Sequence, residues 1–343
     1  MDYTKEKIIR SVKGYIAFID EFVSNREEIV GIRYNNFQKE IDFLNNLASN
    51  KQEINGNLEF FEVLCSVLEK RLDLLKEDRT RTAEKIKLYY RGHYDEKYLL
   101  LPNAIRDNEE KENYFYNEII IRNPNNFANV PHLQKLVTMQ HYGCPTRLLD
   151  VTSNPLVALY FACVNTGCEK CDSCNTGEVV IFAPFEKEVL SFDSDKAMIL
   201  SCLPKYSLET KKDIMKNCYK AIDKREKVLR NINDSVKKLY HEIKSEAPAF
   251  ENIIDPIDVV SSFFVQPLKD NERITKQEGA FIICGLYNSK KDMESALNNL
   301  VVARIKITNK KRILEELDTL GINEATLFPE IDHVAHYLKN RLK

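Results

Sequence analysis

Glycine and proline are scarce in this sequence, and long apolar runs are absent from it. The 343 residues include only 10 Gly and 11 Pro, which excludes collagen-like and linker-dominated chains. No apolar stretch approaches the roughly 18 residues that span a bilayer, so we expect no membrane partner. The first ten residues mix acidic and basic side chains and lack a hydrophobic signal core, so we expect a cytoplasmic protein.

An excess of charge of one sign is also missing. Lys and Arg number 50 against 52 Asp and Glu, and this net charge of -2 argues against a globally basic nucleic-acid binder. Hydrophobic residues make up 43% of the chain and charged residues 30%, which excludes global disorder. At roughly 150 residues for each domain, the length predicts about two domains.

Several short strings that mark common enzyme classes do not occur. The sequence contains no GxGxxG, GxxxxGK[ST], HExxH or GxSxG. No sequence motif therefore indicates a Rossmann dinucleotide site, a P-loop, a zinc peptidase or an α/β-hydrolase.

Helical spacing of apolar residues dominates the first 84 residues. Ile8, Val12, Ile16 and Ile19 recur three or four positions apart, and the leucines between residues 58 and 75 repeat this spacing. Such spacing places the apolar side chains on one face of a helix. We therefore expect a helical N-terminal region over residues 1–84, and this region offers no obvious chemistry.

From residue 85 onward the pattern changes to α+β. Alternating and β-branched segments predict strands at residues 86–90, 178–182, 280–285 and 301–307. Helices are predicted at 131–143, which ends at a glycine, and at 155–163, which begins with a proline. A charged helical insertion at about 206–248 interrupts the strands. Its excess of Lys and Arg fits either a solvated helix face or a nucleic-acid surface.

The densest polar run of the chain is residues 140–154, between two apolar helices. It contains an amide, an imidazole, a guanidinium, a carboxylate and several hydroxyls. Buried polar groups of this kind need hydrogen-bond partners. Arg147 and Asp150 can pair with each other inside the fold or contact a ligand, and the same two readings stay open for the imidazole of His141.

Three segments of the sequence together resemble the FRG domain, a family named for Phe, Arg and Gly residues. They are Tyr90-Arg91-Gly92-His93, Leu101-Pro102 with Arg106, and the long string at residues 140–162. Residues 263–281 and 327–330 resemble the later motifs of the same family. The resemblance covers about residues 86–340 and implies an FRG domain over residues 85–343.

The order of these segments is also similar to that of ADP-ribosyltransferases. This second resemblance implies an α+β fold with a split β-sheet and three site motifs. Arg91 matches the arginine on the first strand that holds NAD, and Thr152 with Ser153 matches the following Ser/Thr turn. The late glutamate beside the nicotinamide ribose corresponds to Glu278, with Gln277 as the alternative.

The two resemblances imply an NAD-using ADP-ribosyltransferase or NAD glycohydrolase. It would act as an intracellular toxin or defence effector on a protein or nucleic-acid acceptor. A guanidinium suits the pyrophosphate of NAD, and a carboxylate stabilises the positive charge on ribose when the nicotinamide bond breaks. Further contacts with NAD are expected from Gly92, His141, Tyr142, Arg147, Ser153 and Asn154. The alternative is a nucleotide-recognition or protein-interaction module without catalysis.

Nine cysteines, an odd number, make a disulfide framework improbable in a chain without an export signal. Cys168, Cys171 and Cys174 follow one another at two-residue gaps, and Cys163 lies just before them. Four thiolates of this kind would satisfy a tetrahedral structural zinc. The alternatives are a reduced, solvent-facing loop without metal and an iron–sulfur cluster.

Overall fold

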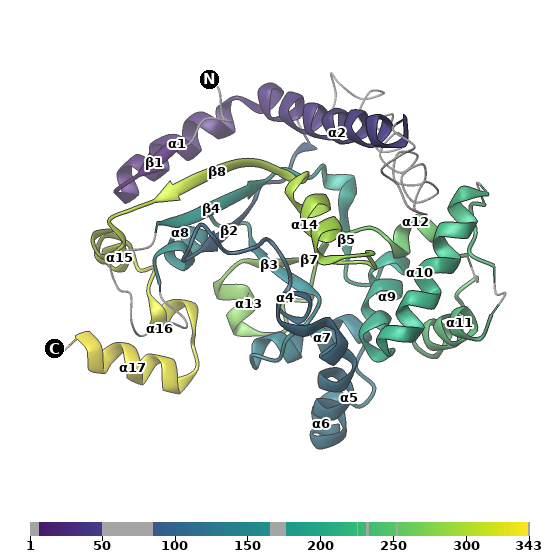
Figure 1. Cartoon of the computed structure of the whole chain (residues 1–343). Helices are drawn as coiled ribbons and strands as arrows, with labels where there is room; N and C mark the ends of the chain where they lie inside the picture. The colour runs from purple at the N-terminus through teal and green to yellow at the C-terminus, as the bar shows by residue number, and fades with distance from the viewer. Residues whose placement is uncertain are drawn as a thin grey trace.

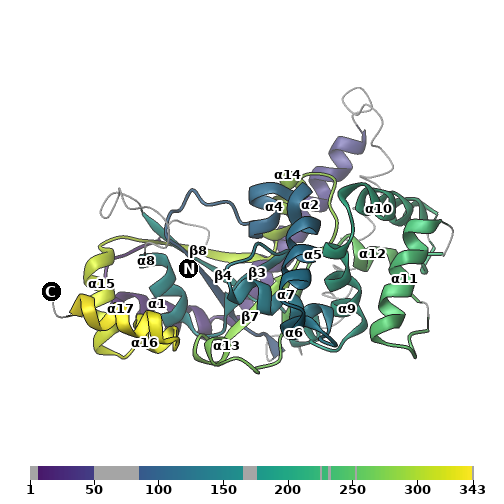
Figure 2. The same cartoon turned by 90° about the horizontal axis from the view of Figure 1, so that it is seen from below.

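The fold is a mixed α+β arrangement around one eight-stranded sheet (Figure 1). The computed structural model describes residues 7–49, 85–164, 176–224, 226–230, 233–251 and 253–341. Within these residues no helix combines the length and the apolar character needed to cross a membrane. Helices α15 to α17 gather at one end of the molecule and α9 to α12 at the other (Figures 1 and 2).

The elements have the following bounds. The strands are β1 (Lys7–Ile9), β2 (Tyr89–His93), β3 (Leu148–Thr152), β4 (Gly177–Phe182), β5 (Val189–Ser191), β6 (Phe263–Gln266), β7 (Gly279–Ile283) and β8 (Val301–Ile307). The helices of the first half are α1 (Val12–Ser24), α2 (Arg26–Ser49), α4 (Asn103–Asn108), α5 (Glu112–Arg122), α6 (Pro124–Phe127), α7 (His132–His141) and α8 (Pro155–Cys163). Those of the second half are α9 (Asp195–Cys202), α10 (Leu208–Asp223), α11 (Asp234–Glu246), α12 (Pro256–Val259), α13 (Glu272–Lys276), α14 (Lys290–Asn298), α15 (Lys310–Thr319), α16 (Glu324–Leu327) and α17 (Ile331–Arg341).

The sheet consists of two halves that meet between β2 and β3. The strand order is β1-β8-β4-β2-β3-β7-β6-β5, and the pairs at the two edges, β1 with β8 and β5 with β6, are parallel. β2 pairs with β4 over five residues, and β3 pairs with β7 over five residues. By contrast, β2 and β3 share one residue pair, Tyr90 with Thr152. The junction between the halves is therefore the least tightly paired place in the middle of the sheet.

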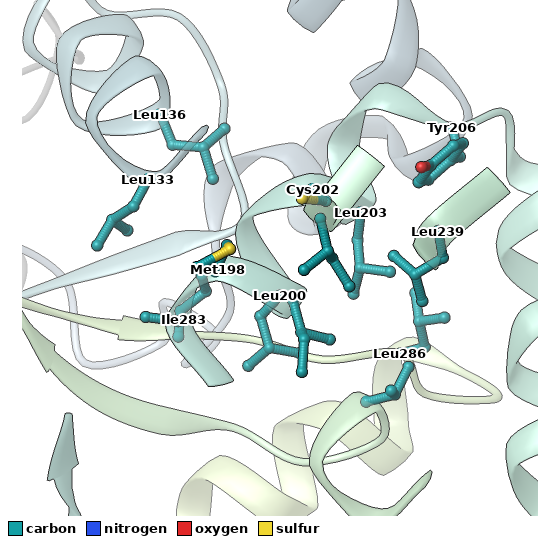
Figure 3. Packing of buried hydrophobic residues seen from close by; sticks show 14 of the residues in the cluster. Leu133, Leu136, Met198, Leu200, Cys202, Leu203, Tyr206, Leu239, Ile283 and Leu286 are labelled. Carbon is teal, nitrogen blue, oxygen red and sulfur yellow. The ribbon is translucent and has the colours of Figure 1, made fainter. Parts of the chain in front are cut away.

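Each half has its own helical cover on one face, and the two halves share a core on the other face. On the first face, α8 and α1 cover the half that contains β4 and β8, while α7 and α9 cover the half that contains β7. Figure 3 shows the second of these cores, in which Leu133 and Leu136 of α7 and Met198 and Leu200 of α9 surround Ile283 of β7. On the opposite face, residues of α4 and α14 pack across both halves.

Helix α8 lies unusually close to the sheet because two glycines leave room for it. A Cβ atom on Gly92 would lie 2.0 Å from the carbonyl oxygen of Ala158, and one on Gly177 would lie 2.2 Å from that of Ala162. No larger residue fits at these positions without moving the helix. Gly92 therefore serves the packing of α8 on β2, on the sheet face opposite the Arg91 side chain.

The N-terminal segment joins the sheet of the later chain. The sequence predicts Ile8 inside a helix, but residues 7–9 form the parallel edge strand β1 and the helix begins at Val12. Ser11 explains the boundary, because its side chain accepts a hydrogen bond from the Gly14 amide and caps the helix. Glu316 of α15 also accepts from the Val12 amide at 2.7 Å. The leucines at 58–75 lie outside the described residues.

Several predicted elements occur where the sequence places them. The predicted helix at 155–163 and the strand at 301–307 match α8 and β8 residue for residue, and the insertion forms α10 and α11. β3 and β6 are not predicted by the pattern, because both are short and β3 carries an aspartate in its middle.

Candidate functional site

Arg91 lies at the junction between the two halves of the sheet. Its Nη1 donates to the main-chain carbonyl of Asp150 on β3 at 2.7 Å, and its Nε donates to His93 Nε2 at 2.9 Å. The side chain is only 16% exposed, and burial lowers the pKa of Arg91 while Asp150 opposes that change. Among the described residues, none accepts a hydrogen bond from its Nη2, so the fixed guanidinium still has N–H groups to offer to an anion.

Asp150 provides the carboxylate nearest to Arg91. Its Oδ2 lies 3.7 Å from Arg91 Nη1, and its side chain is 59% exposed. Gln140, near the end of α7, donates to the Oδ1 of Asp150 at 2.6 Å and accepts from the hydroxyl of Thr146. The polar run at 140–154 thus folds back on itself, and Asp150 contacts Gln140 and Arg91 rather than Arg147.

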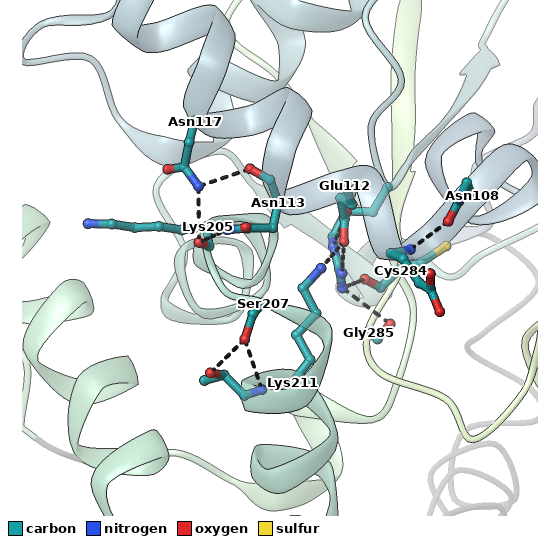
Figure 4. A network of polar contacts seen from close by, with 12 residues as sticks. Asn108, Glu112, Asn113, Asn117, Lys205, Ser207, Lys211, Cys284 and Gly285 are labelled. Atoms are coloured by element: carbon teal, nitrogen blue, oxygen red, sulfur yellow. Dashed lines mark hydrogen bonds and ion pairs between the residues drawn. The ribbon is translucent and has the colours of Figure 1, made fainter.

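Arg147 is fully buried and points away from this junction into another network. Its Nε and Nη2 donate to the two carboxylate oxygens of Glu112 at 2.8 and 2.6 Å, and Lys211 contacts the same carboxylate. Figure 4 shows Glu112 and Lys211 beside the main chain of Cys284 and Gly285, whose carbonyls also accept from Arg147. Burial raises the pKa of Glu112, but the two cations outweigh this effect and bring the pKa to about 2. Arg147 therefore ties α5 and α10 to the sheet.

The Ser/Thr turn after β3 contacts Glu278 directly, although about 125 residues separate them along the chain. Ser153 Oγ lies 3.2 Å from one carboxylate oxygen of Glu278, and Asn154 Nδ2 donates to the other at 2.9 Å. The Ser153 amide also donates to the Glu278 carbonyl at 3.1 Å. The second and third sequence motifs therefore form one cluster around an exposed carboxylate.

The backbone of Glu278 breaks the alternation that a strand would impose. Its φ of 46° lies in the left-handed region, and β7 begins only at the next residue. Regular alternation along a strand would place Glu278 on the same sheet face as Ala280, but this backbone does not continue the strand, so that alternation does not apply to Glu278. Gln277 donates its amide to the Leu327 carbonyl at 3.1 Å, and the buried Thr152 donates its hydroxyl to the Gln277 carbonyl at 2.7 Å. Through these two hydrogen bonds, Gln277 and Thr152 fix the backbone that precedes Glu278.

His141 is enclosed by partners from α13 and the C-terminal segment. Its Nε2 lies 3.1 Å from a carboxylate oxygen of Glu330, and its Nδ1 lies 2.6 Å from the amide of Asn271. Burial and the neighbouring Arg273 lower the pKa of His141, while Glu330 raises it. The adjacent Tyr142 is exposed to solvent and meets the imidazole edge to face. His141 therefore links three segments, and Tyr142 is free to contact a ligand.

The structure thus brings some of the predicted site residues together and separates others. Arg91 and Ser153 lie on or just beyond neighbouring strands, but their side chains turn to different partners, Asp150 and Glu278. Sequence reasoning gave no weight to His93 and Glu178, which lie behind Arg91. The signal for His93 is the run Tyr-Arg-Gly-His, because residues two apart on a strand share a face and His93 therefore lies on the face of Arg91. No local pattern points to Glu178, which meets His93 through the pairing of β2 with β4.

The proposed zinc ligands fall mainly outside the described residues. Cys168, Cys171 and Cys174 are not among those residues, whereas Cys163 is buried at the end of α8. Burial raises the pKa of the Cys163 thiol to about 12, which disfavours the thiolate that zinc requires. Within the part of the chain that the structure describes, no three His, Cys, Asp or Glu residues are placed to hold a metal. Structural zinc stays a prediction.

Comparison with known proteins identifies one domain. Residues 86–170 match the family model of the FRG domain, and these residues include β2, β3 and α8. No curated protein and no solved structure matches the chain. The later motifs at 263–281 and 327–330 lie outside the matched residues.

Proposed function

Because the chain carries an FRG domain, we propose that this domain has an ADP-ribosyltransferase-like split sheet and uses NAD as its substrate. The activity that we propose is transfer of ADP-ribose to an acceptor, or hydrolysis of NAD to ADP-ribose and nicotinamide. The observation that carries the proposal is the position of Arg91, where two half-sheets meet over one residue pair.

The geometry of Arg91 suits one part of NAD, the pyrophosphate. The guanidinium is held on two sides by His93 and Asp150, so little side-chain entropy remains to be lost when an anion binds. Its Nη2 is left for phosphate oxygens, and charge-assisted hydrogen bonds of this kind are among the strongest in proteins. Asp150 is a competing anion that a bound pyrophosphate would displace from Arg91.

Glu278 has the chemistry that the other end of NAD requires. When the bond between nicotinamide and ribose breaks, nicotinamide leaves with the bonding electrons and the ribose carries positive charge. A carboxylate held close to that charge lowers the barrier. Ser153 and Asn154 orient the Glu278 carboxylate from two directions, so it is already placed before a substrate arrives.

The acceptor decides which of the two activities is the physiological one. Attack by water gives free ADP-ribose, and attack by a protein or nucleic-acid nucleophile gives a modified acceptor. For either activity we propose an intracellular toxin or defence role, because both activities consume NAD. Growth arrest on expression of the chain, relieved by Glu278→Gln, tests that role in cells.

One observation favours a second candidate function, recognition of a nucleotide without turnover. The Glu278 carboxylate already accepts two hydrogen bonds, which reduces its capacity to offset a cation. In this reading Arg91 binds phosphate and Glu278 has only a structural role. The two candidates share NAD binding and differ in nicotinamide release.

Titration of the purified chain with NAD tests NAD binding, which both candidate functions require. We expect Arg91→Gln to abolish measurable binding while the chain stays folded. The matched control is Arg122→Gln, because Arg122 pairs with Glu118 on the exposed side of α5. Binding that survives Arg91→Gln contradicts the proposed site, whereas equal loss in both variants points to a general electrostatic effect.

A further inference from the structure

A line of polar side chains lies behind Arg91 and crosses three strands. Arg91 Nε donates to His93 Nε2 at 2.9 Å, and His93 Nδ1 lies 3.6 Å from an oxygen of Glu178 on β4. The same oxygen accepts from Arg304 of β8 at 2.6 Å, and the other end of that guanidinium donates to Asn298 at 2.6 Å. His93 and Glu178 are both buried and face each other in the register of β2 and β4.

The hydrogen bond between Arg91 and His93 fixes the form of the imidazole. An arginine Nε can only donate, so His93 Nε2 must accept and cannot carry a proton. The ring is therefore neutral, with its proton on Nδ1, the nitrogen that faces Glu178. Burial lowers the pKa of His93 to about 4, and Arg91 and Arg304 lower it while Glu178 opposes them. Among the described residues, the buried His93 Nδ1 has no hydrogen-bond partner at its present distance from Glu178.

We infer that His93 and Glu178 are positioning residues that hold the Arg91 guanidinium ready for an anion. Glu178 attracts the imidazole proton to Nδ1, and this leaves the lone pair on Nε2 to accept from Arg91. Arg304 keeps Glu178 in place from the far side. The role in NAD binding rests on the proposed function, but the alignment of Arg91 does not.

Removal of the Glu178 acceptor tests the inference through a signal that a purely structural role would not change. In the wild-type chain, NMR with labelled histidine and arginine should show the Nδ1–H form of His93 and a slowly exchanging Arg91 Nε–H. We expect Glu178→Leu to mix the two neutral forms of His93 and to broaden or remove that Arg91 signal. Glu178→Gln keeps an oxygen acceptor but loses the charge, so it should keep the Nδ1–H form of His93 and an Arg91 Nε–H signal that exchanges faster than in the wild type.

The matched control removes another ion pair that involves β8. Glu96 contacts Lys306 of β8 at 3.0 Å, and no described contact joins it to His93 or Arg91. Glu96→Leu should leave both NMR signals unchanged. Melting curves of all three variants identify any that fail to fold, and Glu178→Gln then carries the comparison, since weakened acceptance should speed exchange of the Arg91 proton.

The two proposals fail in different ways. Unchanged Arg91 and His93 signals in folded Glu178→Leu overturn the positioning inference, whatever NAD does. The expected NMR changes without any binding of NAD to the wild type leave the inference standing and overturn the proposed function. If both hold, Glu178→Leu should weaken NAD binding about tenfold, as loss of one well-oriented charge-assisted hydrogen bond would.

Discussion

The side chain of Arg91 donates a hydrogen bond to the main-chain carbonyl of Asp150, not to its carboxylate. The Asp150 carbonyl accepts from Arg91 at 2.7 Å, whereas the Asp150 carboxylate lies 3.7 Å away and is bonded to Gln140. The position of the guanidinium therefore does not depend on the charge of Asp150. The carboxylate can move away when an anion approaches, and its exposure makes this movement inexpensive.

Asp150→Asn should strengthen NAD binding rather than weaken it. The substitution removes a negative charge that competes with pyrophosphate for Arg91, but it keeps the main-chain carbonyl that holds the arginine. We expect affinity to rise severalfold at low salt and less at high salt, because partly exposed charges are screened. Calorimetric titration at two salt concentrations measures this. Weaker binding would place Asp150 among the groups that contact the substrate.

Gly92→Ala should destabilise the fold strongly and affect NAD binding only through folding. The new Cβ would lie 2.0 Å from the Ala158 carbonyl and 2.6 Å from the Ala162 amide, so α8 has to move. We expect a loss of about 3 kcal/mol, the upper end for overpacking. Gly31→Ala on α2 is the control, since its Cβ meets nothing within 4 Å. Equal melting temperatures of the two variants would contradict the close packing of α8.

The buried triad of Glu112, Arg147 and Lys211 should respond unequally to removal of its members. Glu112→Gln leaves two buried cations without an anion, and we expect a loss of roughly 3–5 kcal/mol. Lys211→Met leaves the Arg147–Glu112 pair intact and overall neutral, so it should cost little or even stabilise the fold. Chemical denaturation compares the two. A larger cost for Lys211→Met would mean that the lysine is the indispensable partner.

His93 should make the chain less stable as the pH falls. Its pKa is about 4 in the folded state and about 6.5 when unfolded, so the unfolded chain takes up the proton first. The stability linked to the neutral ring is complete above pH 6.5 and declines as the pH falls towards 4, by roughly 3 kcal/mol in all. His93→Gln lacks this titration. Between pH 7 and 4, the free energy of unfolding should therefore fall more steeply with decreasing pH in the wild type than in His93→Gln. The same pH dependence in both proteins would contradict a neutral buried imidazole.

The sequence predicts helix boundaries well where a capping or turn residue stands at the end of the apolar pattern. Pro155 follows Asn154, which caps α8 by accepting from the Leu156 amide, and both helix ends lie where the pattern places them. Gly321 lies just after α15 and has a positive φ, a conformation typical of glycine at the end of a helix.

The candidate site is less accessible to sequence reasoning, because its contacts are long-range. Arg147 and Asp150 are three residues apart and look like one pair, yet the partner of Arg147 is Glu112, 35 positions earlier. Strand alternation does not extend to Glu278, because this residue has a left-handed backbone and lies just before β7. The link between Arg91 and Glu178 depends on strand order, which no local pattern encodes.

Release of nicotinamide from NAD by the purified chain tests the central proposal most directly, with Glu278→Gln and Gln277→Ala measured beside the wild type. The Gln277 amide donates its hydrogen bond to the Leu327 carbonyl, so we expect Gln277→Ala to keep most of the activity per folded molecule. Glu278→Gln keeps the shape of the side chain and removes its charge, so it should lower the rate about a hundredfold or more. Nicotinamide release that is undetectable in the wild type, or equal in the wild type and Glu278→Gln, would contradict catalysis by this carboxylate.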